Sequence, residues 1–261
     1  MKAIFVTGGG SGIGRATAVL FAGHGWRVGL ADVDTAGLAA TAALLPAGTA
    51  TTYRMDVRDR DAWTETLAAF TALTGGTLDV LFNNAGIAAG GPLATITDEE
   101  FDRLVAINFT GVANGARAGH PYLKATRGSC LLNTASASAI WGSPGLATYS
   151  ATKFAVRGLT EALDGEWAAD GIRVRSLMPG FVDTPLLAVS VAGTNHSARD
   201  RVVAGGLEFT PVERVAEAAW AAVHDGPLHT PVGRTARRLA FAARWMPGRL
   251  RAGMRRRALH R

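Results

Sequence analysis

Residues 7–14 read Thr-Gly-Gly-Gly-Ser-Gly-Ile-Gly and lie between a short apolar run at 2–6 and an Ala-rich helical pattern. Glycines in a strand-to-helix turn let the backbone approach a pyrophosphate, which the free N–H groups of the helix N-terminus bind. The spacing is T-G-x-x-x-G-x-G rather than G-x-G-x-x-G, so an ordinary Gly-rich turn is the alternative. The stretch predicts a nucleotide site that includes Gly8, Gly10, Ser11, Gly12, Ile13 and Gly14.

Strand and helix patterns alternate along the rest of the chain. Expected strands cover residues 2–6, 27–31, 51–55, 78–82, 129–133, 172–177 and 229–232. Expected helices cover residues 12–24, 34–45, 59–73, 97–121, 148–169 and 211–224. Strands separated by helices of this length pair in parallel through right-handed crossovers. The pattern therefore predicts an α/β fold, a doubly wound parallel sheet of the Rossmann type, as a single domain over residues 1–233.

Composition sets the broad class. A chain of 261 residues with 48% hydrophobic residues fits one large domain with a full core. The single cysteine, Cys130, excludes an internal disulfide and is expected to be a buried core thiol. Only four apolar residues separate Lys2 from Thr7, too few for a signal peptide, so a cytoplasmic location is expected. The six histidines have no metal-ligand spacing, and no metal site is predicted.

The end of the second expected strand carries a carboxylate, Asp32. A carboxylate at this place binds both ribose hydroxyls and repels a 2′-phosphate. Neither Ser11, before Gly12, nor Val33, after Asp32, is basic, so the sequence favours NAD over NADP. The alternative is that Asp32 or Asp34 only caps the next helix.

Two further strand ends carry candidate cofactor contacts. The third expected strand ends where an adenine would lie, and small residues after the fourth let the chain pass close to a ribose. Asn side chains there can also tie neighbouring strands together. These stretches add Asp56, Val57, Asn84, Ala85 and Gly86 to the predicted cofactor site.

The fifth expected strand leads to Ser136, and Tyr149 follows thirteen residues later with Lys153 one helical turn beyond. Residues at i and i+4 share one helix face. The tyrosine pKa, ordinarily about 10, is too high for a base at neutral pH. A nearby ammonium and the positive nicotinamide of NAD would both lower it. Taken alone, Tyr-x-x-x-Lys is a common solvated helix face.

Together, the Gly-rich turn, Asp32, the Asn-Asn-Ala-Gly stretch and the Ser, Tyr and Lys positions resemble the short-chain dehydrogenase/reductase family over residues 2–232. The resemblance implies that Tyr149 is the acid/base and that Lys153 holds the nicotinamide ribose and lowers the tyrosine pKa. It implies that Ser136 bonds the reacting oxygen and that Asn108 holds a water in a proton relay. It also implies a homodimer or homotetramer, and nicotinamide contacts from Pro179, Gly180, Val182 and Thr184.

The substrate side is the least regular part, with a lid expected at about residues 180–207. Its candidate residues are mostly apolar and hold no cluster of charge, which indicates a small hydrophobic alcohol or carbonyl substrate. The alternative is that they simply pack the lid shut. The candidates are Ala88, Ala89, Ser138, Trp141, Phe181, Leu186, Leu187 and Val189.

Residues 234–261 form a separate basic extension. They contain ten arginines and no acids; without those ten the 27 basic residues fall to 17 against 21 acidic ones, a net charge of −4. Apolar residues among the arginines predict a basic amphipathic helix, or two joined at Pro247. Such a segment can bind peripherally to an anionic membrane at its inner face, or cover the substrate mouth or a partner subunit. Nucleic-acid binding is the least favoured of these roles, because the sequence contains no recognised nucleic-acid-binding module.

These features predict an NAD-dependent oxidoreductase that transfers a hydride between NAD(H) and a hydrophobic alcohol, ketone or aldehyde. One alternative is an epimerase or dehydratase on the same fold, in which the hydride returns to the substrate. The other is an NAD-binding regulatory or membrane-tethered protein without turnover.

Overall fold

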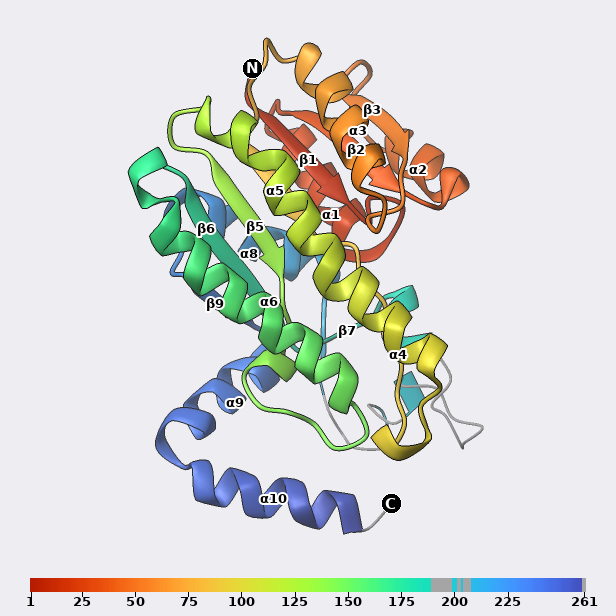
Figure 1. Cartoon of the computed structure of the whole chain (residues 1–261), viewed down its shortest axis with the longest axis vertical. Coiled ribbons are helices and arrows are strands. Elements are labelled where there is room, and N and C mark those ends of the chain that lie inside the picture. Colours follow the sequence, from red (N-terminus) through yellow and green to blue (C-terminus); the bar gives the residue numbers. More distant parts are fainter. Residues whose placement is uncertain (189–198, 201–202, 204–207, 260–261) are drawn as a thin grey trace.

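The computed structural model describes residues 1–188, 199–200, 203 and 208–259. Its main sheet has the strand order β3-β2-β1-β4-β5-β6-β9, and every neighbouring pair is parallel (Figure 1). This order reverses between β1 and β4, and it confirms the predicted doubly wound sheet. The strands are β1 Ala3–Thr7, β2 Arg27–Asp32, β3 Ala50–Arg54, β4 Val80–Asn83, β5 Cys130–Thr134, β6 Arg173–Pro179 and β9 His229–Val232.

Helices cover both faces of the sheet. Buried side chains of α1, α2 and α8 pack on one face, and those of α3, α5 and α6 pack on the other. Further helices lie at the end of the sheet where the strands point (Figure 1). The bounds are α1 Gly12–Gly23, α2 Thr35–Ala42, α3 Arg60–Ala72, α4 Asp98–Val105, α5 Gly111–Lys124, α6 Ala147–Glu166, α8 Val212–Asp225, α9 Arg234–Trp245 and α10 Pro247–Leu259.

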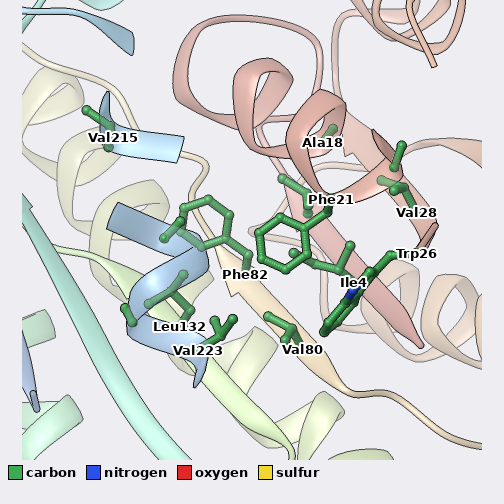
Figure 2. Packing of buried hydrophobic residues seen from close by; sticks show 14 of the residues in the cluster. Ile4, Ala18, Phe21, Trp26, Val28, Val80, Phe82, Leu132, Val215 and Val223 are labelled. Atoms are coloured by element: carbon green, nitrogen blue, oxygen red, sulfur yellow. The ribbon is translucent and has the colours of Figure 1, made fainter. Parts of the chain in front are cut away.

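The first core cluster joins α1 and α8 to the sheet through aromatic side chains (Figure 2). The ring of Phe21 lies edge-on to Trp26 at 5.0 Å and to Trp220 at 4.9 Å. Phe82 from β4 is fully buried in the same cluster. Burying one such side chain contributes about 1.5–3 kcal/mol, so this face fixes where the start of α1 meets the sheet.

The second core cluster positions the carboxyl end of β3. Trp63 on α3 is buried, and its indole N–H donates a hydrogen bond of 2.9 Å to the carbonyl oxygen of Val57. Helix α5 approaches closely because Gly111 and Gly115 have no side chain; a Cβ on Gly111 would lie 2.7 Å from Val57, and one on Gly115 2.6 Å from Trp63. This packing holds Asp56 and Val57 at the edge of the sheet.

The helix expected at 97–121 differs from the structure. Thr97 caps its start as expected, accepting the Glu100 N–H at 3.2 Å. A π-helical turn, Ala106–Thr110, then separates α4 from α5, and α5 continues through Pro121 to Lys124. The expected end at Pro121 is wrong because Leu123 is fully buried in the second core, and its packing outweighs the hydrogen bond that proline removes.

Beyond the sheet, the basic extension forms two helices, α9 and α10, joined at Pro247 as one of the two expected forms (Figure 1). Within the described part of the chain, no helix is long and apolar enough to cross a membrane. The expected lid lies largely outside the described residues, as does Val189. Its described start forms β7 Phe181–Val182, which pairs in parallel with β8 Phe209–Thr210.

We predict that Gly14→Ala destabilises the fold, because its Cβ would collide with the Gly8 carbonyl oxygen and lie 2.9 Å from the Asn84 side chain. Overpacking of this kind costs about 1–3 kcal/mol, measured as the free energy of unfolding in denaturant. Gly23→Ala in the same helix is the control, because its Cβ would meet nothing within 4 Å. Equal stability of the two variants would contradict the packing of this turn.

Candidate active site

One cavity of about 980 Å³ opens at the edge of the sheet where the strands end. It is at the large end of the range for ligand pockets, and it lies where doubly wound sheets bind ligands. Residues from every predicted motif line it: Gly8, Ser11, Gly12, Ile13, Asp32, Val33, Asp56, Val57, Asn84, Ala85, Gly86, Ser136, Ser138, Tyr149, Lys153, Pro179, Gly180, Phe181, Val182, Thr184, Leu186 and Leu187.

The Gly-rich turn presents the N-terminus of α1 to this cavity. Gly8 and Gly12 have φ of 67° and 50°, a backbone region that glycine adopts without strain. Ser11 precedes the helix, but its side chain makes no capping hydrogen bond to the first turn. A Cβ on Gly12 would lie 3.0 Å from the methyl group of Thr184, so the chain comes close from both sides. Uncapped N–H groups in such a turn suit a pyrophosphate.

Asp32 faces the cavity from the end of β2. Its carboxylate accepts the Gly10 N–H at 3.0 Å and the Asp34 N–H at 3.1 Å. The cap of α2 is Asp34 instead, which accepts the Gly37 N–H at 3.0 Å. The two carboxylates therefore divide the roles that the sequence left open: Asp34 caps the helix and Asp32 is directed at the cavity.

Two arginines near this end of the cavity are engaged by the protein itself. Arg15 donates to the Gly10 carbonyl oxygen and, at 3.0 Å, to the Thr41 hydroxyl. Arg58 forms a bidentate pair with Asp56, and the guanidinium holds the pKa of that carboxyl below its usual value. Both guanidiniums are thus hydrogen-bonded within the protein.

Asparagine amides tie the strand ends together, as expected. The Asn84 amide donates to the Thr7 carbonyl oxygen at 2.9 Å and accepts from the Thr134 hydroxyl at 3.1 Å. One residue earlier, Asn83 donates to Asn133 at 3.1 Å. These bonds link β1, β4 and β5 directly beneath the cavity.

Ser136 and Tyr149 lie close enough for their side chains to interact, and both line the cavity. Burial raises the pKa of Tyr149 above its usual value, and the Ser136 side chain lowers it only in part. The groups of the protein thus move this pKa in the direction opposite to the one expected from a neighbouring ammonium, because spacing along a helix says nothing about desolvation. Ser138 lies beside them and donates its N–H to the Ser136 oxygen at 3.1 Å.

Lys153 is almost fully buried, with an exposed fraction of 3%. Its ammonium donates a hydrogen bond of 2.9 Å to the Thr134 carbonyl oxygen and lies 5.7 Å from the centre of the Tyr149 ring. Burial lowers the pKa of Lys153 to about 8. A charge this far from water is costly unless a partner stabilises it, so the Thr134 carbonyl fixes where the ammonium lies.

Asn108 lies in the π-helical turn and is completely buried. Its amide accepts the Ile87 N–H at 2.8 Å and donates to the Ile87 carbonyl oxygen at 2.9 Å. A Cβ on Gly86 would lie 3.2 Å from the Asn108 oxygen and 3.5 Å from the Lys153 ammonium. The asparagine thus positions the loop that passes over Lys153.

Some predicted site residues lie outside the cavity lining. The Gly10 N–H is bonded to Asp32, Gly14 packs on Gly8, and Asn108 lies behind Ile87. Trp141 and Ala89 are also absent from the lining, whereas Ala88 is part of it.

Sequence reasoning missed part of the lining. Arg103 on α4 contributes to it, and so do side chains of both helices of the basic extension. Their helical periodicity was visible in the sequence, but which surface they cover depends on the turn before α9. The residues from the extension are Thr235, Arg238, Leu239, Ala242, Arg249, Leu250, Gly253 and Met254.

Cys130 takes no part in the site. It is fully buried in the first core, and burial raises its thiol pKa to about 12. Among the residues that the structure describes, no group of three or more His, Cys, Asp or Glu side chains is placed to hold a metal ion.

A protein-family model described as short chain dehydrogenase matches residues 2–194. The chain belongs to this family. It is 34% identical over 219 residues to a 3-oxoacyl-(acyl-carrier-protein) reductase of Thermotoga maritima. The aligned region covers 83% of this chain and 87% of that protein. This family relationship makes the chain an oxidoreductase of the short-chain dehydrogenase type.

Two solved structures show the same fold with nicotinamide cofactors. The 3-ketoacyl-(acyl-carrier-protein) reductase from Brucella melitensis, complexed with NADH, matches with a TM-score of 0.77 at 32% identity, over 88% of this chain and 95% of that one. An alcohol dehydrogenase from Thermococcus sibiricus, complexed with 5-hydroxy-NADP, matches with a TM-score of 0.71 at 26% identity, over 84% and 88%. The fold thus accommodates either kind of nucleotide.

Proposed function

We propose that the chain is an NAD-dependent oxidoreductase that moves a hydride between the cofactor and a hydrophobic alcohol, ketone or aldehyde. The observation that carries the proposal is that Ser136, Tyr149 and Lys153 meet on the wall of the same cavity that Asp32 and the Gly-rich turn line. A dinucleotide site and an acid/base group in one cavity are the two parts that hydride transfer to a carbonyl requires.

The residues present fit a nicotinamide dinucleotide. The pyrophosphate would lie on the uncapped start of α1, beside Gly8 and Gly12. Asp32 would bind the adenosine ribose, and Lys153 the nicotinamide ribose, with Thr184 near the carboxamide. When bound, the cofactor accepts or supplies the hydride.

The side chains of the chain handle the proton. In oxidation, the Tyr149 phenolate takes the proton of the substrate hydroxyl as the hydride leaves the carbon; in reduction, the phenol returns that proton to the carbonyl oxygen. Ser136 donates a hydrogen bond to the same oxygen and stabilises its developing charge. The raised pKa of Tyr149 keeps the phenol protonated at neutral pH, the form that reduction needs. The Lys153 ammonium favours the phenolate that oxidation needs.

The preference for NAD rests on the charges near the ribose site. The Asp32 carboxylate would repel a 2′-phosphate, and Val33 after it is apolar and 59% exposed. The guanidiniums that could offset this repulsion, Arg15 and Arg58, are bonded to Gly10 and Asp56.

An apolar substrate is supported by the wall beyond Tyr149. Phe181, Leu186 and Leu187 line it from the lid side. Leu239 and Met254, from the basic extension, also line it. A cavity wall of this kind binds an apolar substrate because both the wall and the substrate bury apolar surface away from water.

Assembly as a homodimer or homotetramer stays a prediction. It is supported by two large apolar side chains on neighbouring helices: Phe101 on α4 is 41% exposed and Phe154 on α6 is 40% exposed. The cytoplasmic location and a peripheral membrane contact through the basic extension also stay predictions.

We predict that Tyr149→Phe lowers kcat by at least about 100-fold for oxidation of apolar secondary alcohols, because the proton acceptor is lost while the cofactor site is kept. The measurement is net NADH formation on a panel of alcohols graded by chain length, with calorimetry of NAD binding beside it. Tyr122→Phe is the control, since this tyrosine lies on α5 outside the cavity lining.

Retained turnover in Tyr149→Phe would overturn its role as the acid/base. Substrate conversion without net NADH would support the epimerase or dehydratase alternative. NAD binding without any Tyr149-dependent turnover would support the regulatory alternative.

We predict that Asp32→Asn raises the ratio of kcat/KM with NADP to that with NAD by about tenfold or more, since one charge repelling the 2′-phosphate is removed. The ratio is measured with one alcohol at fixed ionic strength. Asp34→Ala is the matched control: it removes the α2 cap, at a cost of about 1 kcal/mol in stability, without touching the cavity. An unchanged ratio in Asp32→Asn would remove the basis for the NAD preference.

A further inference from the structure

The two helices of the basic extension each turn one face to the active-site cavity. On α9 the lining positions are Thr235, Arg238, Leu239 and Ala242, which recur at helical spacing. On α10 they are Arg249, Leu250, Gly253 and Met254, again one face. Because positions three and four residues apart share a helix face, this is a continuous wall and not scattered contacts.

That wall combines apolar side chains with arginines. Leu239, Leu250 and Met254 are half-buried, whereas Arg238 and Arg249 are exposed at its rim. Within the described part of the chain, neither arginine forms an ion pair with a carboxylate, unlike Arg234, which lies 3.7 Å from Glu208.

Charge is divided along the cavity. The acids that line it, Asp32 and Asp56, both lie at the end predicted to hold the adenosine half of the cofactor, where Arg58 also lines the cavity and is paired with Asp56. Helices α4, α9 and α10 contribute three arginines to the lining, Arg103, Arg238 and Arg249, and none of their described acidic residues lines the cavity. A cavity lined by one sign of charge concentrates ligands of the opposite sign.

We propose that α9 and α10 form the outer half of the substrate site and select an amphipathic substrate: an apolar chain carrying the reacting hydroxyl or carbonyl at one end and an anionic group at the other. The apolar chain lies against Leu239, Leu250 and Met254, and Arg238 and Arg249 bind the anionic group. This proposal rests on the proposed function and narrows its substrate class. It adds an anionic group to the hydrophobic substrate that the sequence predicts.

The alternative ligand for these two helices is an anionic membrane surface. Phe241 and Trp245 on the outer side of α9 are 58% and 64% exposed and could face lipid. The cavity-lining face is favoured for the substrate because it is continuous with the wall that holds Ser136 and Tyr149.

The test compares hydroxy acids of the butanoate, hexanoate, octanoate and decanoate series, each with its hydroxyl on the penultimate carbon, with their methyl esters. We expect kcat/KM for the acid to exceed that for its ester by about tenfold at one chain length, the effect of a single charge-assisted hydrogen bond. The double variant Arg238→Gln/Arg249→Gln should lose this ratio, and added salt should reduce it. Arg237→Gln, the adjacent arginine outside the cavity lining, should keep it.

Calorimetry of octanoate and octanol binding to the protein alone gives a second measure that needs no turnover. Tighter binding of octanoate, lost in the double variant only, supports the proposal. An acid-to-ester ratio near one at every length overturns it and leaves the proposed function intact, since the esters still report hydride transfer.

If neither acids nor esters turn over with NAD or NADP, the proposed function fails. Octanoate binding alone then tests whether Arg238 and Arg249 bind an anionic group. Vesicles containing phosphatidylglycerol form the last arm. Equal loss of vesicle binding in Arg237→Gln and in the double variant, with no change in acid selectivity, would assign the arginines to a membrane surface and overturn the proposal.

Discussion

The buried ammonium of Lys153 is the constraint on which the active site depends. Its exposed fraction is 3%, and its hydrogen bond of 2.9 Å goes to a backbone carbonyl, that of Thr134 at the end of β5. A buried charge is tolerated only where such a partner is held in place. The site therefore requires α6 to pack on the sheet so that the ammonium meets this one carbonyl oxygen.

The surrounding structure supplies that precision. The Asn84 amide joins the end of β4 to Thr7 and Thr134, and Asn108 holds the loop at Ile87 that passes over Lys153. Asn108 reaches this loop from a π-helical turn, a local distortion that often marks a functional site. The same contacts that stabilise the strand ends thus set the distance between the ammonium and the Tyr149 ring.

The fold and much of the cavity could be predicted from the sequence because parallel strands bring their carboxyl ends to one edge. This rule alone places Asp32, Asn84 and Ser136 together, whatever the lengths of the intervening helices. The Thr134 carbonyl could not be predicted, since a backbone acceptor has no sequence signature. The burial that raises the Tyr149 pKa in the protein without cofactor could not be predicted either, because desolvation depends on packing.

The position of the basic extension was also out of reach of the sequence. Its course is set at Gly233, where φ is 89° and a Cβ would collide with the Thr210 hydroxyl. This turn leads α9 back toward the cavity, so a segment that resembles a membrane-binding helix in sequence lies against the active site. Periodicity predicted amphipathic helices, but only the turn determined what they cover.

The most direct test of this account is the pKa of Lys153 in the free protein, measured by NMR on protein labelled with carbon-13 at the lysine ε-carbon. The exposed Lys2 and Lys124 are the only other lysines, and Lys153→Met assigns the remaining resonance. The account predicts a titration midpoint of about 8, because burial disfavours the charged form. A midpoint near the ordinary lysine value of about 10.4 would show a solvated ammonium and contradict it.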